Sequence, residues 1–388
     1  MKKYKRILVL ILDSVGCGIQ SDYKKFHNLK ANTLGTLYSK KSFSLPNLEK
    51  MGIDELVLDE PEKMSKAIFG KMIERTMGND TFAGVWEMMG IIFKKRFRSK
   101  KMGFSKKVTN KIENVIGVPI VGNEYISGFK ALDKYYDAHK KTNSPIIYLA
   151  DDGVVLFAAH ESVIAADKLN EMARMIGPIL REQNISRIIT RPFVGKKYNF
   201  IRTDNRRDFV LINNTKHSLI EQLKKMNIKF LTTEHLYNIL SQPSNVDYIK
   251  GNHNNEQLLR KINKNLREIK DKAIMLFCLQ DFDMYGHRKD IDGYAKKLIS
   301  FDKALPNMLN NLNDDDLLII TADHGCDPGL NIRGHTREFV PCLIYSKNLE
   351  KIRSNIGDRK SFSDIGQTIC YNYSLPKLKN GKVIYEIF

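Results

Sequence analysis

The sequence predicts an α/β fold in which helices flank a mainly parallel sheet. Three short apolar runs, at residues 6–12, 274–279 and 316–320, are bounded by polar residues, as is typical of buried strands. Between the last two runs, apolar side chains recur at three- and four-residue steps, which predicts an amphipathic helix: Tyr294, Leu298, Phe301, Leu305 and Met308. Strands that alternate with helices favour a parallel sheet.

Basic residues precede the first apolar run, as they do in a signal peptide. The apolar part, Ile7 to Leu12, is too short for a signal peptide and ends in Asp13 without a small-residue cleavage site. No stretch approaches the ~20 apolar residues that a membrane helix needs. We therefore expect this run to be the first strand of the sheet, and we expect no membrane association.

Two prolines bear on the later elements. Pro306 lies within the predicted helix and is expected to kink it or end its regular portion. Residues 340–345 form a further predicted strand, and Pro341 favours a place at its beginning or at a sheet edge.

Polar residues follow each of the three predicted strands. Asp13 follows the first, Asp283 and His287 come after the second, and Asp323 with His324 follows the third, ahead of His335. The carboxyl ends of parallel strands are where ligands bind in open sheets. Adjacent Asp and His side chains at a strand end point in different directions, so they can serve two metal ions. Paired metals typically assist phosphoryl transfer and hydrolysis.

Helix capping is the alternative for these aspartates, because Asp is a preferred N-cap residue after a strand. Capping explains a single Asp, but it does not explain the accompanying histidines. Gly286, between Asp283 and His287, is expected to let the backbone turn tightly.

The order of the candidate ligands predicts a discontinuous core domain. Asp13 lies early in the chain and the other ligands lie late, so one metal cluster requires both ends of the chain in one domain. We predict a core formed by residues 1–93 and 215–388, with a smaller inserted α/β domain at residues 94–214.

Composition limits the class of protein. The 388 residues suffice for two domains, and five scattered cysteines do not form a disulfide framework, which favours reduced thiols in the cytoplasm. Cys326 could be taken for a metal ligand, but a thiolate suits Zn²⁺ better than Mn²⁺. The net charge of +19 permits nonspecific nucleic-acid binding. No signature of a dedicated nucleic-acid reader is present, so a solvated Lys-rich surface is the favoured interpretation.

Further segments, taken in order with those above, form a set that is much more specific to one protein family than any single segment. They comprise residues 31–35, 45–48, 78–87, 158–161, 191–195 and 202–206. The ordered set resembles the alkaline phosphatase superfamily and, within it, the phosphopentomutase family, over nearly the whole chain. The resemblance implies an alkaline-phosphatase-like α/β core with a mainly parallel sheet, plus a smaller inserted α/β cap domain.

The resemblance also implies the chemistry of the site. It implies two Mn²⁺ ions per chain, one held by Asp283, His287 and His335 and the other by Asp13, Asp323 and His324. It places Thr81 between them as the residue that carries the phosphoryl group. The positions that match the family's substrate contacts are Asp152, Arg191 and Arg206. Asp80 is expected to be a capping or turn residue.

The implied enzyme is an isomerase that interconverts ribose or deoxyribose 1-phosphate and 5-phosphate through phosphothreonine, with a sugar bisphosphate as activator. Pentose phosphates are the expected partners, without specific nucleic acid, and the oligomeric state is open. A metal-dependent phosphatase or phosphodiesterase, or a mutase of another sugar phosphate, is the alternative. The chain departs from the family pattern at Val85, Phe129 and Lys130, and its Asp283–His287 spacing is shorter.

Overall fold

The computed structural model describes most of the chain. The described residues are 3–26, 29–40, 42–59, 67–97, 99–150, 153–212, 215–226, 228–332, 334–349 and 352–388. The chain divides into two compact units. The first unit comprises residues 1–94, 215–237 and 243–388, and the second comprises residues 95–214 and 238–242.

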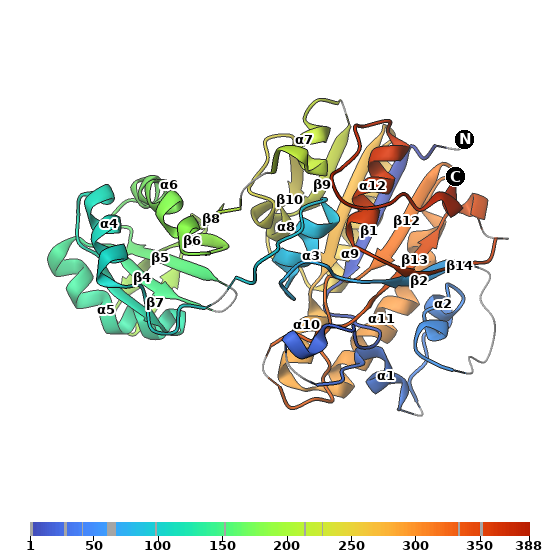
Figure 1. The fold of residues 1–388 in the computed structure, drawn as a ribbon, viewed down its shortest axis with the longest axis horizontal. Helices are drawn as coiled ribbons and strands as arrows, with labels where there is room; N and C mark the ends of the chain where they lie inside the picture. The colour runs from blue at the N-terminus through green and yellow to red at the C-terminus, as the bar shows by residue number, and fades with distance from the viewer. Residues whose placement is uncertain are drawn as a thin grey trace. The chain divides into compact units, whose positions relative to one another are not determined.

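The first unit is built on one sheet, whose strands among the described residues run in the order β10-β9-β11-β1-β12-β13-β2-β14 (Figure 1). Their bounds are β1 Arg6–Leu12, β2 Ile68–Met72, β9 Lys229–Thr233, β10 Val246–Ile249, β11 Ala273–Leu279, β12 Asp316–Thr321, β13 Val340–Tyr345 and β14 Ser354–Arg359. Only β13 runs antiparallel to its two neighbours within this described sheet. The mainly parallel sheet predicted from the apolar runs is therefore confirmed.

Helices flank this sheet on both faces (Figure 1). Their bounds are α1 Thr33–Tyr38, α2 Pro46–Glu49, α3 Thr81–Met88, α7 Leu219–Leu223, α8 Glu234–Ile239, α9 Asn255–Glu268, α10 Asp281–Arg288, α11 Ile291–Asn310 and α12 Ser363–Asn372. Helix α12 packs against α3 and α7, whereas α11 packs against α1, α2, α9 and α10. Every residue of β1, β11 and β12 is buried, as expected of parallel strands covered on both faces.

The two prolines have different outcomes. Of the two outcomes expected at Pro306, a kink or an end of the regular helix, the end is excluded, because α11 continues through Pro306 to Asn310. The buried side chains of Phe301, Leu305 and Met308 hold this helix against the core, and tertiary packing outweighs the hydrogen bond that proline removes. Pro341 lies near the start of β13, as predicted, and precedes the residues that pair with β12.

The second unit is a smaller α/β unit with its own sheet and two apolar clusters. Its sheet runs in the order β3-β4-β5-β6-β7, and β8 pairs with β6. The bounds are β3 Val121–Tyr125, β4 Ile146–Leu149, β5 Val154–His160, β6 Arg187–Lys196, β7 Asn199–Arg202, β8 Arg207–Val210, α4 Lys106–Ile116, α5 Gly128–Thr142 and α6 Ala166–Glu182. Helices α4 and α6 contribute to one cluster and α5 to the other.

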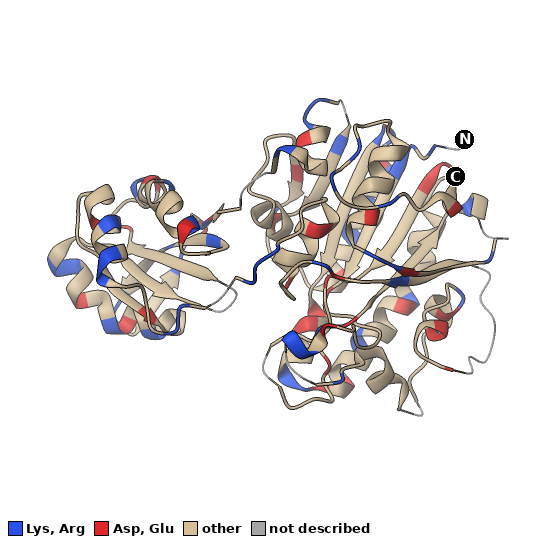
Figure 2. Ribbon diagram, viewed as in Figure 1, with Lys and Arg blue, Asp and Glu red and all other residues tan. Residues whose placement is uncertain are grey.

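Lysine and arginine are spread over the helices and loops of both units, interspersed with acidic residues (Figure 2). Among the described residues, no helix is both long enough and apolar enough to cross a membrane.

Candidate active site

The carboxyl ends of three neighbouring strands bring the first candidate ligands together. Strand β1 pairs in parallel with β11 on one side and β12 on the other, and the registers align their carboxyl ends. Asp13 follows β1, while Asp323 and His324 follow β12 after one alanine. All three side chains are buried. The predicted strand ends therefore meet at one edge of the sheet.

The buried group is compact, and two of its carboxylate oxygens lack a hydrogen-bond donor among the described residues. His324 Nε2 lies 3.4 Å from Asp13 Oδ1 and 3.5 Å from Asp323 Oδ2. Asp323 Oδ1 accepts a hydrogen bond from the Ser14 amide at 3.1 Å. Within the described part of the chain, Asp13 Oδ1 and Asp323 Oδ2 are buried and accept no hydrogen bond. Buried carboxylate oxygens without donors are unfavourable unless a cation or a proton compensates them.

A second group is more exposed and adjoins the first. His287 Nε2 lies 3.3 Å from Asp283 Oδ2, and His335 Nε2 lies 3.6 Å from Asp283 Oδ1. The rings of His324 and His335 have their centroids 4.0 Å apart, which joins the two groups. Asp283 Oδ1 is a further buried oxygen without a hydrogen bond among the described residues.

The backbone around Asp283 differs from the sequence expectation. Asp283 and His287 lie four positions apart on helix α10 rather than on either side of a tight turn, so the role predicted for Gly286 is wrong. Gly286 is helical, and a Cβ there would lie 2.7 Å from the carbonyl oxygen of Cys326. The glycine lets α10 approach the segment that follows β12.

Thr81 lies at the first position of helix α3, beside the buried group. Its Oγ1 is 3.4 Å from His324 Nε2. Asp80 caps the helix, because its side chain accepts a hydrogen bond from the Ala83 amide at 2.9 Å, as predicted. A Cβ at Gly84 would lie 2.5 Å from the carbonyl oxygen of Asp323, so this glycine permits the close contact between α3 and the end of β12.

Burial and neighbouring charges shift the pKa values of the acidic and imidazole groups in this buried group. Burial, followed by the charges of Asp323 and Asp283, raises the pKa of Asp13 well above its usual range. Burial also raises the pKa of Asp323 to about 6 and lowers the pKa of His324 to about 3. A divalent cation would oppose the shifts of the two carboxyl groups, because it favours their ionised form, and would reinforce the shift of His324, because it favours the neutral imidazole.

The donor set fits metal binding. Three overlapping groups of side chains have ligand atoms within 4.8 Å of one another: Asp283, His287 and His335; Asp13, Asp283 and His324; Asp13, Cys278 and Asp323. Carboxylate oxygen and imidazole nitrogen together suit Mn²⁺ or a similar divalent ion. The buried oxygens of Asp13, Asp283 and Asp323 that accept no hydrogen bond from the described residues fit a metal centre. The predicted set Asp283, His287 and His335 is one of the groups, whereas Asp13 is grouped with Asp283 and His324 or with Cys278 and Asp323, and not, within the described part of the chain, with Asp323 and His324 together.

Sequence reasoning missed Cys278. Its Sγ lies 3.2 Å from Asp13 Oδ2. The register places Cys278 opposite Ile11, and alternation along β1 puts Ile11 on the same side as Asp13. Cys326, considered from its position beside His324, is buried and belongs to none of the three groups found among the described residues.

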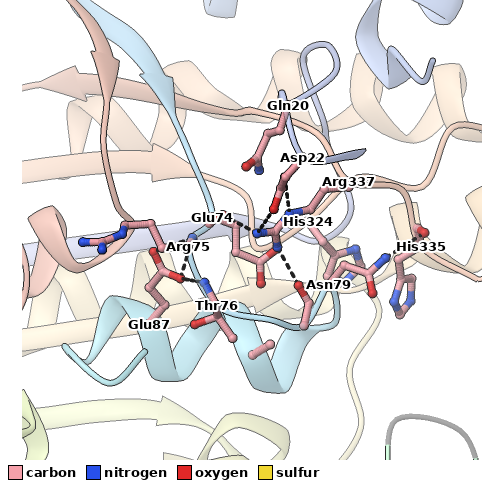
Figure 3. A network of polar contacts seen from close by, with 12 residues as sticks. Gln20, Asp22, Glu74, Arg75, Thr76, Asn79, Glu87, His324, His335 and Arg337 are labelled. Carbon is pink, nitrogen blue, oxygen red and sulfur yellow. Dashed lines mark hydrogen bonds and ion pairs between the residues drawn. The ribbon is translucent and has the colours of Figure 1, made fainter. Parts of the chain in front are cut away.

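A second feature missed by sequence reasoning is the network around Arg337 (Figure 3). The guanidinium donates to Glu74 Oε2 at 2.7 Å, to Gly78 O at 2.6 Å and to the carbonyl oxygen of Glu74. It also donates to both carboxylate oxygens of Asp22, at 3.1 and 3.2 Å. These contacts use all five N–H groups of the side chain. Arg337 therefore ties the segment before Thr81 to the segment after Asp13.

Glu87 fixes the other side of the segment that precedes Thr81 (Figure 3). Its buried carboxylate accepts hydrogen bonds from the amides of Arg75 and Thr76, at 2.9 and 2.6 Å. It also accepts from Ser361 Oγ at 2.7 Å. Asn79 donates to the carbonyl oxygen of His335 at 2.9 Å. This irregular segment is thus held by side-chain contacts where regular backbone pairing is absent.

The predicted substrate residues belong to the second unit. Arg191 lies on β6, and Arg206 directly precedes β8. Arg206 forms a bidentate pair with Asp208, at 2.8 and 3.0 Å. Asp152 lies outside the described residues.

Comparisons with known proteins give this arrangement a family. Residues 5–377 match the Metalloenzyme superfamily. The phosphopentomutase of Alkaliphilus oremlandii is 39% identical over 97% of both chains. That of Caldanaerobacter subterraneus is 36% identical over 97% of this chain and 96% of its own.

The chain belongs to the phosphopentomutase family. It is accordingly an enzyme of the isomerase class, and the superfamily and the ligand groups together support metal dependence. The phosphoglycerate mutase of Leishmania mexicana shares the fold of this chain, with a TM-score of 0.51 and 9% identity over 98% of this chain and 97% of its own. The alkaline-phosphatase-like fold predicted from the sequence is confirmed.

Proposed function

We propose that this protein is a phosphopentomutase that interconverts the 1-phosphate and 5-phosphate of ribose or deoxyribose through phosphothreonine at Thr81. The observation that carries the proposal is the position of Thr81 Oγ1, 3.4 Å from His324 Nε2 at the junction of the candidate ligand groups. His324 shares a group of candidate ligands with Asp13 and Asp283, so the Thr81 hydroxyl adjoins a group suited to hold a metal. The family membership supplies the substrate class.

Two divalent ions, which we propose to be Mn²⁺, would share the candidate ligands. Asp283, His287 and His335 would hold one, and Asp13, Asp323 and His324 the other. Such ions favour the alkoxide of an alcohol and offset charge on transferring phosphoryl oxygens. The ring contact between His324 and His335 supports adjacent sites, because these two histidines are assigned to different ions and their ring centroids lie 4.0 Å apart.

The position of Thr81 also suits the phosphorylated state. Thr81 is the first residue of α3, and the amino end of a helix favours negative charge. Because the side chain of Asp80 caps the Ala83 amide, that carboxylate is engaged in holding the helix start. Arg337 and Glu87 fix the preceding segment, so Thr81 is presented from a rigid support.

The proposed cycle moves one phosphoryl group at a time. The phosphoryl group passes from Thr81 Oγ1 to the free hydroxyl of a pentose monophosphate, which gives a bisphosphate. The other phosphate of that bisphosphate then returns to Thr81, leaving the isomeric monophosphate. A sugar bisphosphate primes an unmodified Thr81 by the second step alone. In the second unit, Arg191, Arg206 and Asp152 are the proposed substrate contacts.

The test is an assay of ribose 1-phosphate with Mn²⁺ and a trace of sugar bisphosphate, in which ribose 5-phosphate and free phosphate are measured together. Ribose 5-phosphate without matching phosphate release supports the mutase. Release of phosphate alone would identify a phosphatase instead, and a Thr81→Ala variant with full activity would overturn the role of Thr81. The matched Thr109→Ala variant, at a partly buried residue of α4 in the second unit, should behave as the parent.

A further inference from the structure

The start of helix α5 lies against the side chain of Arg202. A Cβ at Gly128, the first residue of the helix, would lie 2.1 Å from Arg202 Nη2 and 3.3 Å from Tyr148 Oη. The ring of Phe129 covers the guanidinium, with its centroid 4.6 Å from Arg202 Cζ. The N-cap residue Ser127 makes no side-chain capping hydrogen bond. The helix start is therefore open and adjoins a cation.

Sheet pairing places Arg191 on the same face as Arg202. Arg202 is opposite Phe193 in the β6–β7 ladder, and Arg191 lies two residues before Phe193 on β6. Residues two apart on a strand share a face. Both positive charges act on Tyr148, whose pKa burial raises and whose hydroxyl Arg202 contacts. Arg191, Arg202 and Tyr148 thus converge beneath the start of α5.

The two arginines lack carboxylate partners among the described residues. No ion pair joins either of them to an acid there, and their Nε atoms are buried without a hydrogen-bond acceptor. Arg206 differs, because Asp208 neutralises it through two hydrogen bonds. Burial, followed by the charges of Arg206 and Arg202, lowers the pKa of Arg191 to about 10. Both residues are partly buried, and two adjacent guanidinium groups that form no ion pair of their own within the described residues are a ready site for an anion.

We propose that Arg191, Arg202, the Tyr148 hydroxyl and the amino end of α5 bind the phosphate monoester of the sugar phosphate, with Arg202 as a specificity-determining residue. The inference rests on the proposed function, because that function supplies the ligand. Guanidinium groups bind phosphate oxygens bidentately, and an open helix start adds amide donors. Arg206 is already paired with Asp208, which makes Arg202 the better second donor.

The proposal also gives Phe129 a role. Phe129 is half exposed and is one of the departures from the family pattern. Its ring restricts the guanidinium of Arg202 to one plane, so the N–H groups point to a fixed place. Lys130 is exposed and has no contact that includes it in the site.

The test is calorimetric titration of the full-length, Mn²⁺-loaded protein with ribose 5-phosphate, ribose and inorganic phosphate, alongside mutase kinetics. Arg202→Gln should weaken ribose 5-phosphate binding and raise KM by about tenfold or more, because a charge-assisted, bidentate contact is lost. Arg202→Lys keeps the charge but lacks the planar guanidinium, so its ribose 5-phosphate affinity and KM should lie between those of the parent and of Arg202→Gln. Arg207→Gln is the matched control, since this arginine is exposed and faces away in the ladder with Thr190.

Unchanged ribose 5-phosphate affinity in a folded Arg202→Gln protein would overturn the proposal. Inorganic phosphate that competes with ribose 5-phosphate and binds as tightly would overturn it too, because the site would then serve free phosphate. If the parent protein lacks mutase activity while Arg202→Gln still loses ribose 5-phosphate binding, the proposed function fails and the phosphate site stands. If the parent is an active mutase and Arg202→Gln has the same ribose 5-phosphate affinity and KM, the proposed phosphate site is wrong and the proposed function stands.

Discussion

Replacing Arg337 by lysine keeps the positive charge and removes the planar fork of donors. Arginine uses five N–H groups here, whereas lysine has three, so at least two hydrogen bonds are lost. Their acceptors are carboxylates and the carbonyl oxygens of Glu74 and Gly78. At about 1–2 kcal/mol for each lost bond to a buried acceptor, Arg337→Lys should lower the free energy of unfolding by about 2–4 kcal/mol.

The effect on catalysis should exceed the effect on substrate binding. Arg337 holds the segment that leads to Thr81, and it contacts none of the proposed substrate residues. A displacement of a reacting group by ~1 Å can lower the rate about 10²-fold. We expect Arg337→Lys to lower kcat by about that factor with little change in KM, and to slow the phosphorylation of Thr81 by a sugar bisphosphate.

Three measurements check this reasoning: thermal unfolding, kcat with KM, and the rate at which intact mass rises by one phosphoryl group. The matched control is Arg207→Lys, because Arg207 is exposed and donates a long hydrogen bond, at 3.4 Å, to Gln242 Oε1, and such surface contacts contribute little. An Arg337→Lys protein with the parent's melting temperature and kcat would refute the positioning role. A loss confined to KM would refute it as well, since it would show that Arg337 acts on the substrate.

Other predictions concern the metal, the helix contact and alkaline pH. Chelation of divalent ions should lower the melting temperature, and Mn²⁺ at about 100 times its Kd should restore about 2.7 kcal/mol per site; an unchanged melting curve would contradict the metal centre. Gly84→Ala should lower kcat, because its Cβ would lie 2.5 Å from the carbonyl oxygen of Asp323, whereas Gly177→Ala, whose Cβ meets only the flexible end of a leucine, should leave kcat unchanged. Burial raises the pKa of Tyr4 from 10.0 to about 12. The unfolded chain therefore loses this proton first, stability falls as pH rises from about 10 to 12, and Tyr4→Phe should flatten that slope in urea titrations.

The strands and their terminal aspartates were predictable because their signal is local. The runs that became β1, β11 and β12 are buried on both faces and so are continuously apolar. An aspartate directly after such a run stands out in the sequence. The meeting of Asp13 with Asp323 follows from parallel pairing, which the alternation of strands and helices already favoured.

The remainder of the site depends on contacts that no local pattern encodes. Gly286 suggested a turn because glycine often occurs in turns. In the structure, a glycine is needed there because the carbonyl oxygen of Cys326 leaves no room for a Cβ. Arg337 and Glu74 are 263 positions apart, and nothing around either residue indicates the other. The side-chain partners of Glu87 are likewise distant, since Ser361 lies 274 positions away. Such pairings become visible only when the fold brings them together.

The central place of β1 has a consequence for synthesis on the ribosome. The strand Arg6–Leu12 is wholly buried between β11 and β12, and Arg6 pairs with Asp316 across 310 positions. Its partners are translated only after the whole of residues 95–214, which can form their own apolar clusters meanwhile. The apolar, strand-forming segment 6–12 thus remains unpaired for most of translation. An exposed segment of this kind promotes aggregation and chaperone binding. Fragments that end before β12 should accumulate as inclusion bodies, whereas the complete chain buries the segment on release.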